Sequence, residues 1–257
     1  MLRRLNGSFG RLGKFMWVMG GAAALLLALL LVASSSGHTH ALGRVATVPA
    51  AASTVEVGTG LPGLNLYEFV GRVDQAGVAF TGYGYLSYLR GMDNSQIFSN
   101  PLNPSEGTAH FTYYATATLT SRAVISSIFA IDSVGPITFY YQPTPSAAFD
   151  KPASFAAGTP IATGVIRYQS ILNVQAPNQG ISDGIGEFVQ ATAGPFSIGG
   201  TYYQFGQAGM VERMTTFGQG TRLDALLPKS FVVLSGNAVD TGQRQLQLPY
   251  VSKDTSD

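Results

Sequence analysis

Between Thr108 and Val124 the side chains alternate with a period of two. Aromatic and aliphatic residues at the odd positions from 111 to 119 alternate with mostly threonine at the even positions from 112 to 120. Nothing in this stretch recurs at the 3.6-residue period of a helix, and Thr and Tyr favour a pleated strand. The stretch therefore predicts a β-strand, and it limits the fold to one that contains a sheet.

Similar alternation recurs along the chain and predicts further strands. These strands are expected at residues 66–74, 78–89, 127–132, 137–142, 164–175, 186–192, 200–207, 210–217 and 230–234. Gly, Pro and Asn fill the breaks between them, as at 135–136, 177–180, 183–184 and 218–220, which is typical of turns. No helical stretch is long enough for a parallel crossover. The sequence predicts an all-β fold, a single antiparallel β-barrel or sandwich of about 8–10 strands, preceded by an N-terminal hydrophobic helix.

Several expected strands are apolar on both faces, as in residues 78–89. Two explanations fit: a barrel with a filled interior whose outside packs on loops or another subunit, or an exposed patch that binds something. Gly82 and Gly84 share one face and indicate a bend or a close backbone approach. In the connection 143–160 we expect one or two helical turns, anchored on the sheet by Phe149 and Phe155.

The amino terminus has the pattern of an export signal. Arg3, Arg4, Arg11 and Lys14 precede an uncharged run at 15–33, and small residues follow at 34–37. A cleaved signal peptide and a retained transmembrane anchor both fit this pattern. Either way, the positive-inside rule predicts that most of the chain is exported, extracellular or anchored in the cytoplasmic membrane with the β domain outside.

The expected organisation has four parts: a signal or anchor at 1–37, a flexible tether at 38–63, the β domain at 64–238 and a loose tail at 239–257. The chain has a net charge of +1 and no Cys. No basic field is present for nucleic acid, and disulfides, Cys-ligated zinc and thiol nucleophiles are excluded. We expect no cofactor and no metal, and membrane contact through the N-terminal segment.

Few residues offer chemistry in the expected β domain. His110 is its one histidine, since the other two lie in the tether at 38 and 40. Tyrosine pairs such as Tyr113 and Tyr114 place one ring on each face of a strand, and a tyrosine ring suits contact with a small ligand.

Glu187 and Glu212 each lie inside an apolar strand. A buried Glu needs an Arg or hydrogen-bond donors, and Arg167 and Arg213 are candidates. Glu212 and Arg213 are adjacent, so they face opposite ways. Two interpretations stay open: cross-strand salt bridges on the solvated face, or a polar cluster inside a barrel. The candidate ligand-binding residues are His110, Tyr114, Arg167, Glu187 and Glu212, and no catalytic residue is assigned.

Three functions are compatible with these observations. The first is a non-enzymatic exported or membrane-anchored β-barrel-like protein that binds a small apolar or aromatic ligand or an envelope partner. The second is a cofactor-free cyclase or isomerase with a pocket inside the barrel. The third is a structural envelope protein that associates with other copies. A cavity that holds an unpaired carboxylate would favour the enzyme.

Overall fold

The computed structural model describes residues 53–224 and 226–244, which belong to one compact unit, Ala50–Asp257. The expected N-terminal hydrophobic helix at 1–37 lies outside the described residues. Within the described ranges, none of the helices has the length and hydropathy needed to cross a bilayer.

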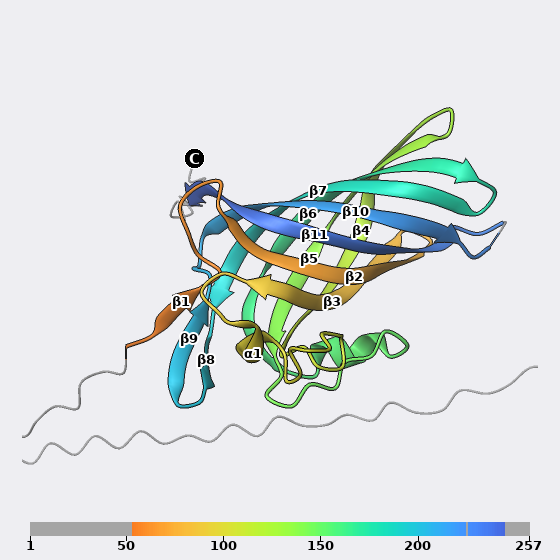
Figure 1. Cartoon of the computed structure of the whole chain (residues 1–257). Coiled ribbons are helices and arrows are strands. Elements are labelled where there is room, and N and C mark those ends of the chain that lie inside the picture. The colour runs from red at the N-terminus through yellow and green to blue at the C-terminus, as the bar shows by residue number, and fades with distance from the viewer. Residues whose placement is uncertain (1–52, 225, 245–257) are drawn as a thin grey trace, which may run out of the picture. The chain divides into compact units, whose positions relative to one another are not determined.

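Eight antiparallel strands form a closed barrel (Figure 1). Around the barrel the order is β10, β11, β2, β3, β4, β5, β6 and β7, after which β7 pairs with β10 and closes the ring. Their bounds are β2 Asn65–Ala76, β3 Ala79–Leu89, β4 Phe111–Ile125, β5 Ile128–Tyr141, β6 Thr159–Ala176, β7 Gln179–Ala193, β10 Met210–Arg222 and β11 Lys229–Arg244. The all-β expectation is confirmed, and the closed order selects the barrel over the sandwich.

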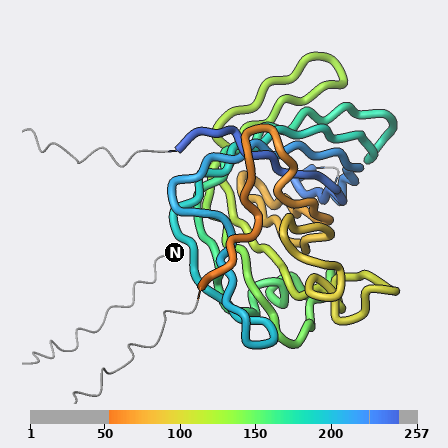
Figure 2. The backbone as a smooth tube through the Cα atoms, turned by 60° about the vertical axis from the view of Figure 1, so that its left-hand side comes forward, coloured from red at the N-terminus to blue at the C-terminus, as the bar shows by residue number. Residues whose placement is uncertain are grey.

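A second, three-stranded sheet lies at one end of the barrel. It consists of β1 (Val55–Val57), β8 (Pro195–Ile198) and β9 (Thr201–Phe205), with β1 parallel to β9. Figure 2 shows β1 running beside the β8–β9 hairpin. Residues of this sheet, among them Phe205, belong to the same buried core as the barrel.

Both margins of the expected β domain differ from the structure. The strand β1 lies inside the segment expected to be a tether, because it gains backbone pairing with β9. The strand β11 runs to Arg244, inside the expected loose tail, because Asp240 and Arg244 pair with β10. Backbone pairing of this kind cannot be read from a polar sequence without knowing the partner strand.

Some glycines expected to make turns lie inside strands. Gly135 is within β5 and Gly218 is within β10. A Cβ atom on either residue would clash with a neighbouring backbone carbonyl oxygen, of Thr116 and Val233 respectively. These glycines permit close approach of neighbouring backbone, so the expected breaks at 135–136 and 218–220 are wrong. The break expected at 183–184 is wrong as well, because it lies inside β7.

Loops cover part of the outer face of the barrel. The connection 143–158 contains a 3-10 helix, η1 (Pro152–Ala156), which confirms the helical turn expected there. Phe155 is fully buried, and its ring lies 5.3 Å from the ring of Tyr83 on β3. The connection between β3 and β4 contains the short helix α1 (Asn94–Ile97). Loop packing therefore accounts for the apolar outer side of β3.

Candidate functional site

Small residues on the inner face leave space inside the barrel. Gly71 of β2 and Gly84 of β3 are register partners, and Tyr113 of β4 pairs with Gly84. A Cβ on Gly84 would lie 2.7 Å from the Tyr113 hydroxyl, and one on Gly71 would clash with it outright. The tyrosine ring therefore lies along the wall, over two positions that carry no side chain. This confirms the close approach expected at Gly84.

The opposite wall repeats the arrangement. Tyr168 of β6 reaches across Gly184 of β7 and hydrogen-bonds the Thr216 hydroxyl on β10. A Cβ on Gly184 would clash with the Tyr168 hydroxyl. Burial raises the pKa of Tyr168 above its usual value, so this phenol stays neutral at physiological pH.

The space left inside the barrel comprises two connected cavities. An inner cavity of about 140 Å³ lies in the middle of the barrel, and a mouth cavity of about 850 Å³ lies at one end. The inner cavity is lined mostly by apolar side chains, including Val73, Phe80, Ala117, Ile137, Ile166 and Leu234. Both cavities share the lining residues Gln75, Ile131, Leu172, Ser230 and Val232. We call the combined space the lumen.

The lumen opens at the end of the barrel that carries the hairpin turns. The residues that line the mouth cavity include Gly77, Ser126 and Asn178, from the turns β2–β3, β4–β5 and β6–β7. These turns lie at the right-hand end of the barrel in Figure 1. We call this end the mouth.

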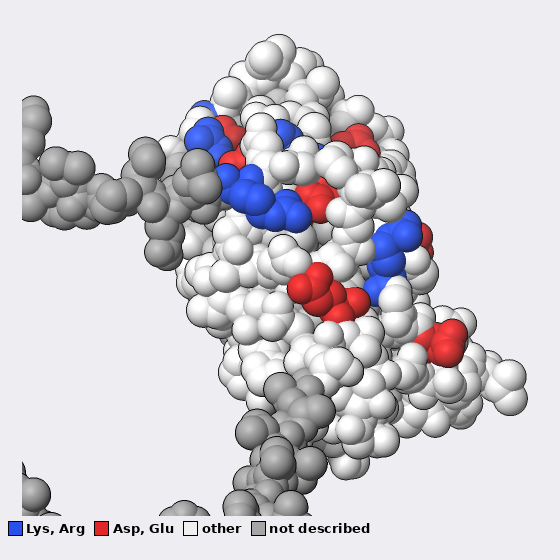
Figure 3. All heavy atoms as spheres, turned by 90° about the vertical axis from the view of Figure 1, so that its left-hand side faces the viewer, with Lys and Arg blue, Asp and Glu red and all other residues white. Residues whose placement is uncertain are grey.

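Aromatic side chains close the other end. Tyr113 and Phe69 line the inner cavity, and their rings are 5.8 Å apart. Beyond them Phe139 stacks on Phe205 of the small sheet, with 4.9 Å between ring centroids. The barrel is therefore a cup with a sealed end. On the surface of that end, basic and acidic side chains are scattered among uncharged ones (Figure 3).

Several hydroxyl groups of the lumen have hydrogen-bond partners in its wall. The hydroxyls of Ser170 and Ser182 lie 2.8 Å apart, and Ser230 donates to the Gln75 side chain at 3.0 Å. A buried polar group that has a partner costs little, so this wall behaves as an apolar surface. Among the described residues that line the two cavities there is no carboxylate and no histidine.

Three of the predicted site residues are placed on β6, β7 and β10. Arg167 and Glu187 are register partners on the exposed outer face, and the Arg213 guanidinium lies 4.0 Å from the Glu187 carboxylate. For Glu187, the interpretation as a salt bridge on the solvated face is confirmed. Glu212 points the other way and is fully buried.

Glu212 belongs to a polar cluster at the sealed end. The Tyr67 hydroxyl donates to its carboxyl group at 2.5 Å, and Asp240 is its register partner on β11. Burial raises the pKa of Glu212 to about 8, and Asp240 adds to the rise, while the Tyr67 hydrogen bond and Arg244 oppose it. The interpretation as an interior polar cluster is therefore confirmed for Glu212, although this residue does not line the lumen.

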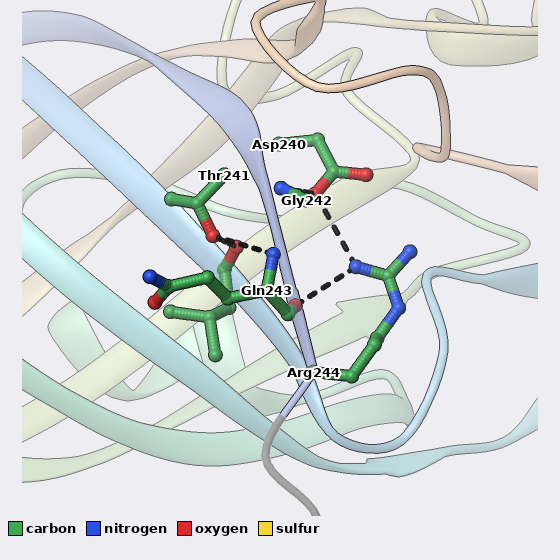
Figure 4. A network of polar contacts seen from close by, with 6 residues as sticks. Asp240, Thr241, Gly242, Gln243 and Arg244 are labelled. Carbon is green, nitrogen blue, oxygen red and sulfur yellow. Dashed lines mark hydrogen bonds and ion pairs between the residues drawn. The ribbon is translucent and has the colours of Figure 1, made fainter.

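Asp240 is held by residues that follow it on β11 (Figure 4). One of its carboxylate oxygens accepts from the Gly242 amide at 2.7 Å and from the Arg244 guanidinium at 3.3 Å. Its other oxygen, like Glu212 Oε1, has no hydrogen-bond partner among the described residues. The buried carboxyl groups of Glu212 and Asp240 are therefore neighbours on paired strands, and one oxygen of each has no hydrogen-bond partner among the described residues.

The remaining two predicted site residues lie away from both the lumen and this cluster. His110 Nδ1 is 2.7 Å from the Gln142 carbonyl oxygen, in the loop region beside β4. Tyr114 packs on the outer cluster formed by Tyr83, Ala147 and Phe155. The structure therefore does not bring the five candidates together, and none of them lines the lumen.

Sequence reasoning missed the residues that line the lumen. A signal was present: Gly180, Ser182, Gly184 and Gly186 place small residues at every second position of one strand. Such a run leaves one face of the strand nearly bare. Comparisons with protein-family models, curated proteins and solved structures found no significant match for this chain.

Proposed function

We propose that this protein binds a small apolar or aromatic ligand in the lumen and is exported or membrane-anchored. The observation that carries the proposal is the cup itself, which has one sealed end and a mostly apolar lining. The mouth cavity of about 850 Å³ is within the range usual for small-molecule sites, roughly 300–1,000 Å³. A barrel built only for strength would fill this space with side chains.

A binding role accounts for the lining better than catalysis does. A cofactor-free cyclase or isomerase needs an acid or base in contact with its substrate. Among the described residues, the one carboxyl group whose pKa is strongly raised, that of Glu212, lies at the sealed end instead. The described lining offers neutral tyrosines and, at the mouth, cationic side chains.

The proposed location rests on the amino terminus. The basic residues before position 15 and the uncharged run at 15–33 have the pattern of an export signal or anchor. In this proposal the β domain works outside the cytoplasm, where an apolar ligand needs a carrier to cross water.

The test uses residues 50–257, the compact unit, and the neutral apolar fluorophore N-phenyl-1-naphthylamine. Ala117 lines the inner cavity, whereas the adjacent Thr118 is exposed on the outer face. We expect Ala117→Phe to weaken fluorophore binding by about tenfold or more, because the ring occupies the lumen. Thr118→Phe, the matched control, should bind as the wild type does.

Circular dichroism shows whether each variant is folded, and Ala117→Leu supplies a smaller filling change if the phenylalanine prevents folding. Equal binding by wild type and folded lumen-filled variants would overturn the proposal. Native mass spectrometry of the chain from its source cells provides an independent check, since a tightly held ligand would co-purify.

A further inference from the structure

A β-bulge turns one arginine toward the mouth of the barrel. In the β4–β5 pairing Leu119 is opposite Ser133, but Ser121 is opposite Asp132, so Thr120 is an extra residue. Beyond the bulge Arg122 pairs with Ile131, which lines both cavities. Cross-strand partners point to the same face. Without the extra residue, strict alternation would place Arg122 on the outer face.

A second arginine, on another strand, also lines the mouth cavity. Arg222 of β10 pairs with Ser230, and Ser230 lines both cavities. In the closed order of eight strands, β4 and β10 are four positions apart in either direction. Arg122 and Arg222 therefore reach the mouth from opposite walls, and both line the mouth cavity.

The surroundings leave this mouth positively charged. Lys229 also lines the mouth cavity, and no Asp or Glu does among the described residues. Asp224 is the nearby acid, and its carboxylate accepts the amides of Leu226 and Leu227. Those two hydrogen bonds lower the pKa of Asp224, with smaller contributions from Lys229 and Arg222. One carboxylate thus offsets part of the charge of three cations.

Arg122 is the cation whose role the fold leaves open. In the described part of the chain it makes no salt bridge, and its guanidinium lies 5.0 Å from the Phe129 ring centroid. Phe129 also lines the mouth cavity. A stacked guanidinium still has its planar donor edge available, and that edge matches a carboxylate or phosphate group.

We propose that the ligand is a single-chain anionic amphiphile, with its alkyl chain in the lumen and its anionic head group between Arg122 and Arg222. This inference rests on the proposed function, because it requires the lumen to be a binding site. The narrow inner cavity accepts the chain, and the wide mouth accepts the head. A free fatty carboxylate and a lysolipid with an anionic head share this chemistry.

The test compares ligands that differ only in the head group. Hexadecanoate and hexadecan-1-ol compete with N-phenyl-1-naphthylamine for residues 50–257. We expect hexadecanoate to bind about tenfold more tightly than the alcohol. Arg122→Gln should remove most of that preference and leave binding of the alcohol unchanged. Arg213→Gln is the matched control, because Arg213 faces outward beside Glu187.

Lysophosphatidylglycerol in the same assay separates the two sources of the anion. Binding of either anion that depends on Arg122 supports the inference, and the tighter of the two identifies the class. If the alcohol competes as well as the anions, or if Arg122→Gln has no effect, the inference is wrong while the proposed function stands. If the fluorophore itself does not bind in the lumen, the proposed function fails first.

Discussion

The hydroxyl of Tyr67 donates to the carboxyl group of Glu212 at 2.5 Å, inside the sealed end of the barrel. Both residues are fully buried, and the facing groups are Asp240 and, farther along β11, Arg244. Burial raises the pKa of both Tyr67 and Glu212. The cluster therefore favours neutral forms, which ties the stability of the barrel to pH.

Stability should fall as the pH rises from about 4.5 to about 8. The folded protein keeps the Glu212 proton up to about pH 8, whereas the unfolded chain releases it near its usual value of 4.5. The folded state thus binds more protons in this window, and the free energy of unfolding decreases with pH. The full effect is on the order of 5 kcal/mol as an upper bound.

Chemical denaturation of residues 50–257 at pH 5 and pH 8 measures this effect. Glu212→Gln should lose most of the difference between the two pH values, because the amide does not titrate. Glu187→Gln removes an exposed carboxylate on the outer face and should keep it. An unchanged pH dependence in Glu212→Gln would contradict the assignment.

Replacing Tyr67 by Phe should destabilise the barrel more at high pH than at low pH. Both oxygens of Glu212 would then lack a partner, since Glu212 Oε1 has none in the described structure. Leaving a buried group unsatisfied costs about 1–3 kcal/mol, and more when it is charged. Denaturation at the same two pH values reads this out. A penalty that is equal at both would argue against a hydrogen bond to the ionised carboxyl.

Gly184→Ala should push the Tyr168 ring away from the wall and into the lumen. The new Cβ would clash with the phenol oxygen, and the ring would also lose its hydrogen bond to Thr216. We expect destabilisation of about 2–3 kcal/mol together with weaker fluorophore binding.

A double-mutant cycle isolates the cause of that loss. Tyr168→Leu removes the clashing atoms, so Gly184→Ala should cost much less in the Leu background, with a coupling of about 1 kcal/mol or more. Additive effects of the two substitutions would show that Tyr168 does not lie against Gly184 in solution.

Gly206→Ala should cost more than Gly199→Ala, although both residues have a positive φ, 59° and 58°. A Cβ at Gly199 meets nothing within 4 Å, whereas one at Gly206 clashes with the Gln190 side chain. Gln190 is buried, and its amide donates to the Phe205 carbonyl at 2.9 Å. It therefore has little freedom to move.

The expected costs are about 1 kcal/mol at Gly199, from backbone strain alone, and about 3 kcal/mol at Gly206. Thermal or chemical unfolding of the two variants provides the comparison. Similar values would mean that Gln190 adapts without losing its hydrogen bonds.

The alternation of side chains was enough to predict most strands of the barrel. The prediction failed at Gly135 and Gly218, where glycine lies inside a strand and permits close approach of a neighbouring backbone. A glycine in a turn and a glycine at such a contact look the same in a sequence. The alternation could not distinguish barrel from sandwich, since closure depends on the pairing of β7 with β10, two strands separated along the chain by the β8–β9 insertion.

The candidate site was less predictable than the fold. The alternation of side chains along a strand correctly predicted that Glu212 and Arg213 lie on opposite faces. It could not predict that Glu212 lies at the sealed end. The bulge at Thr120 reverses the face of Arg122, and a bulge leaves no composition signal of its own. Residues that shape the lumen by being small, such as Gly184 beneath the Tyr168 ring, carry no chemical signature that a search for reactive groups would find.

The inner wall has a consequence for how this protein can change. The width of the lumen depends on wall positions that carry no side chain. Gly82 lines the inner cavity, and a Cβ there would lie 3.7 Å from the side chains of Ala115 and Val73. Adding a methyl group there alters the volume without disturbing the backbone ladder. The volume of the lumen is therefore adjustable by a single carbon atom at this position, while the strands that carry the wall keep their register.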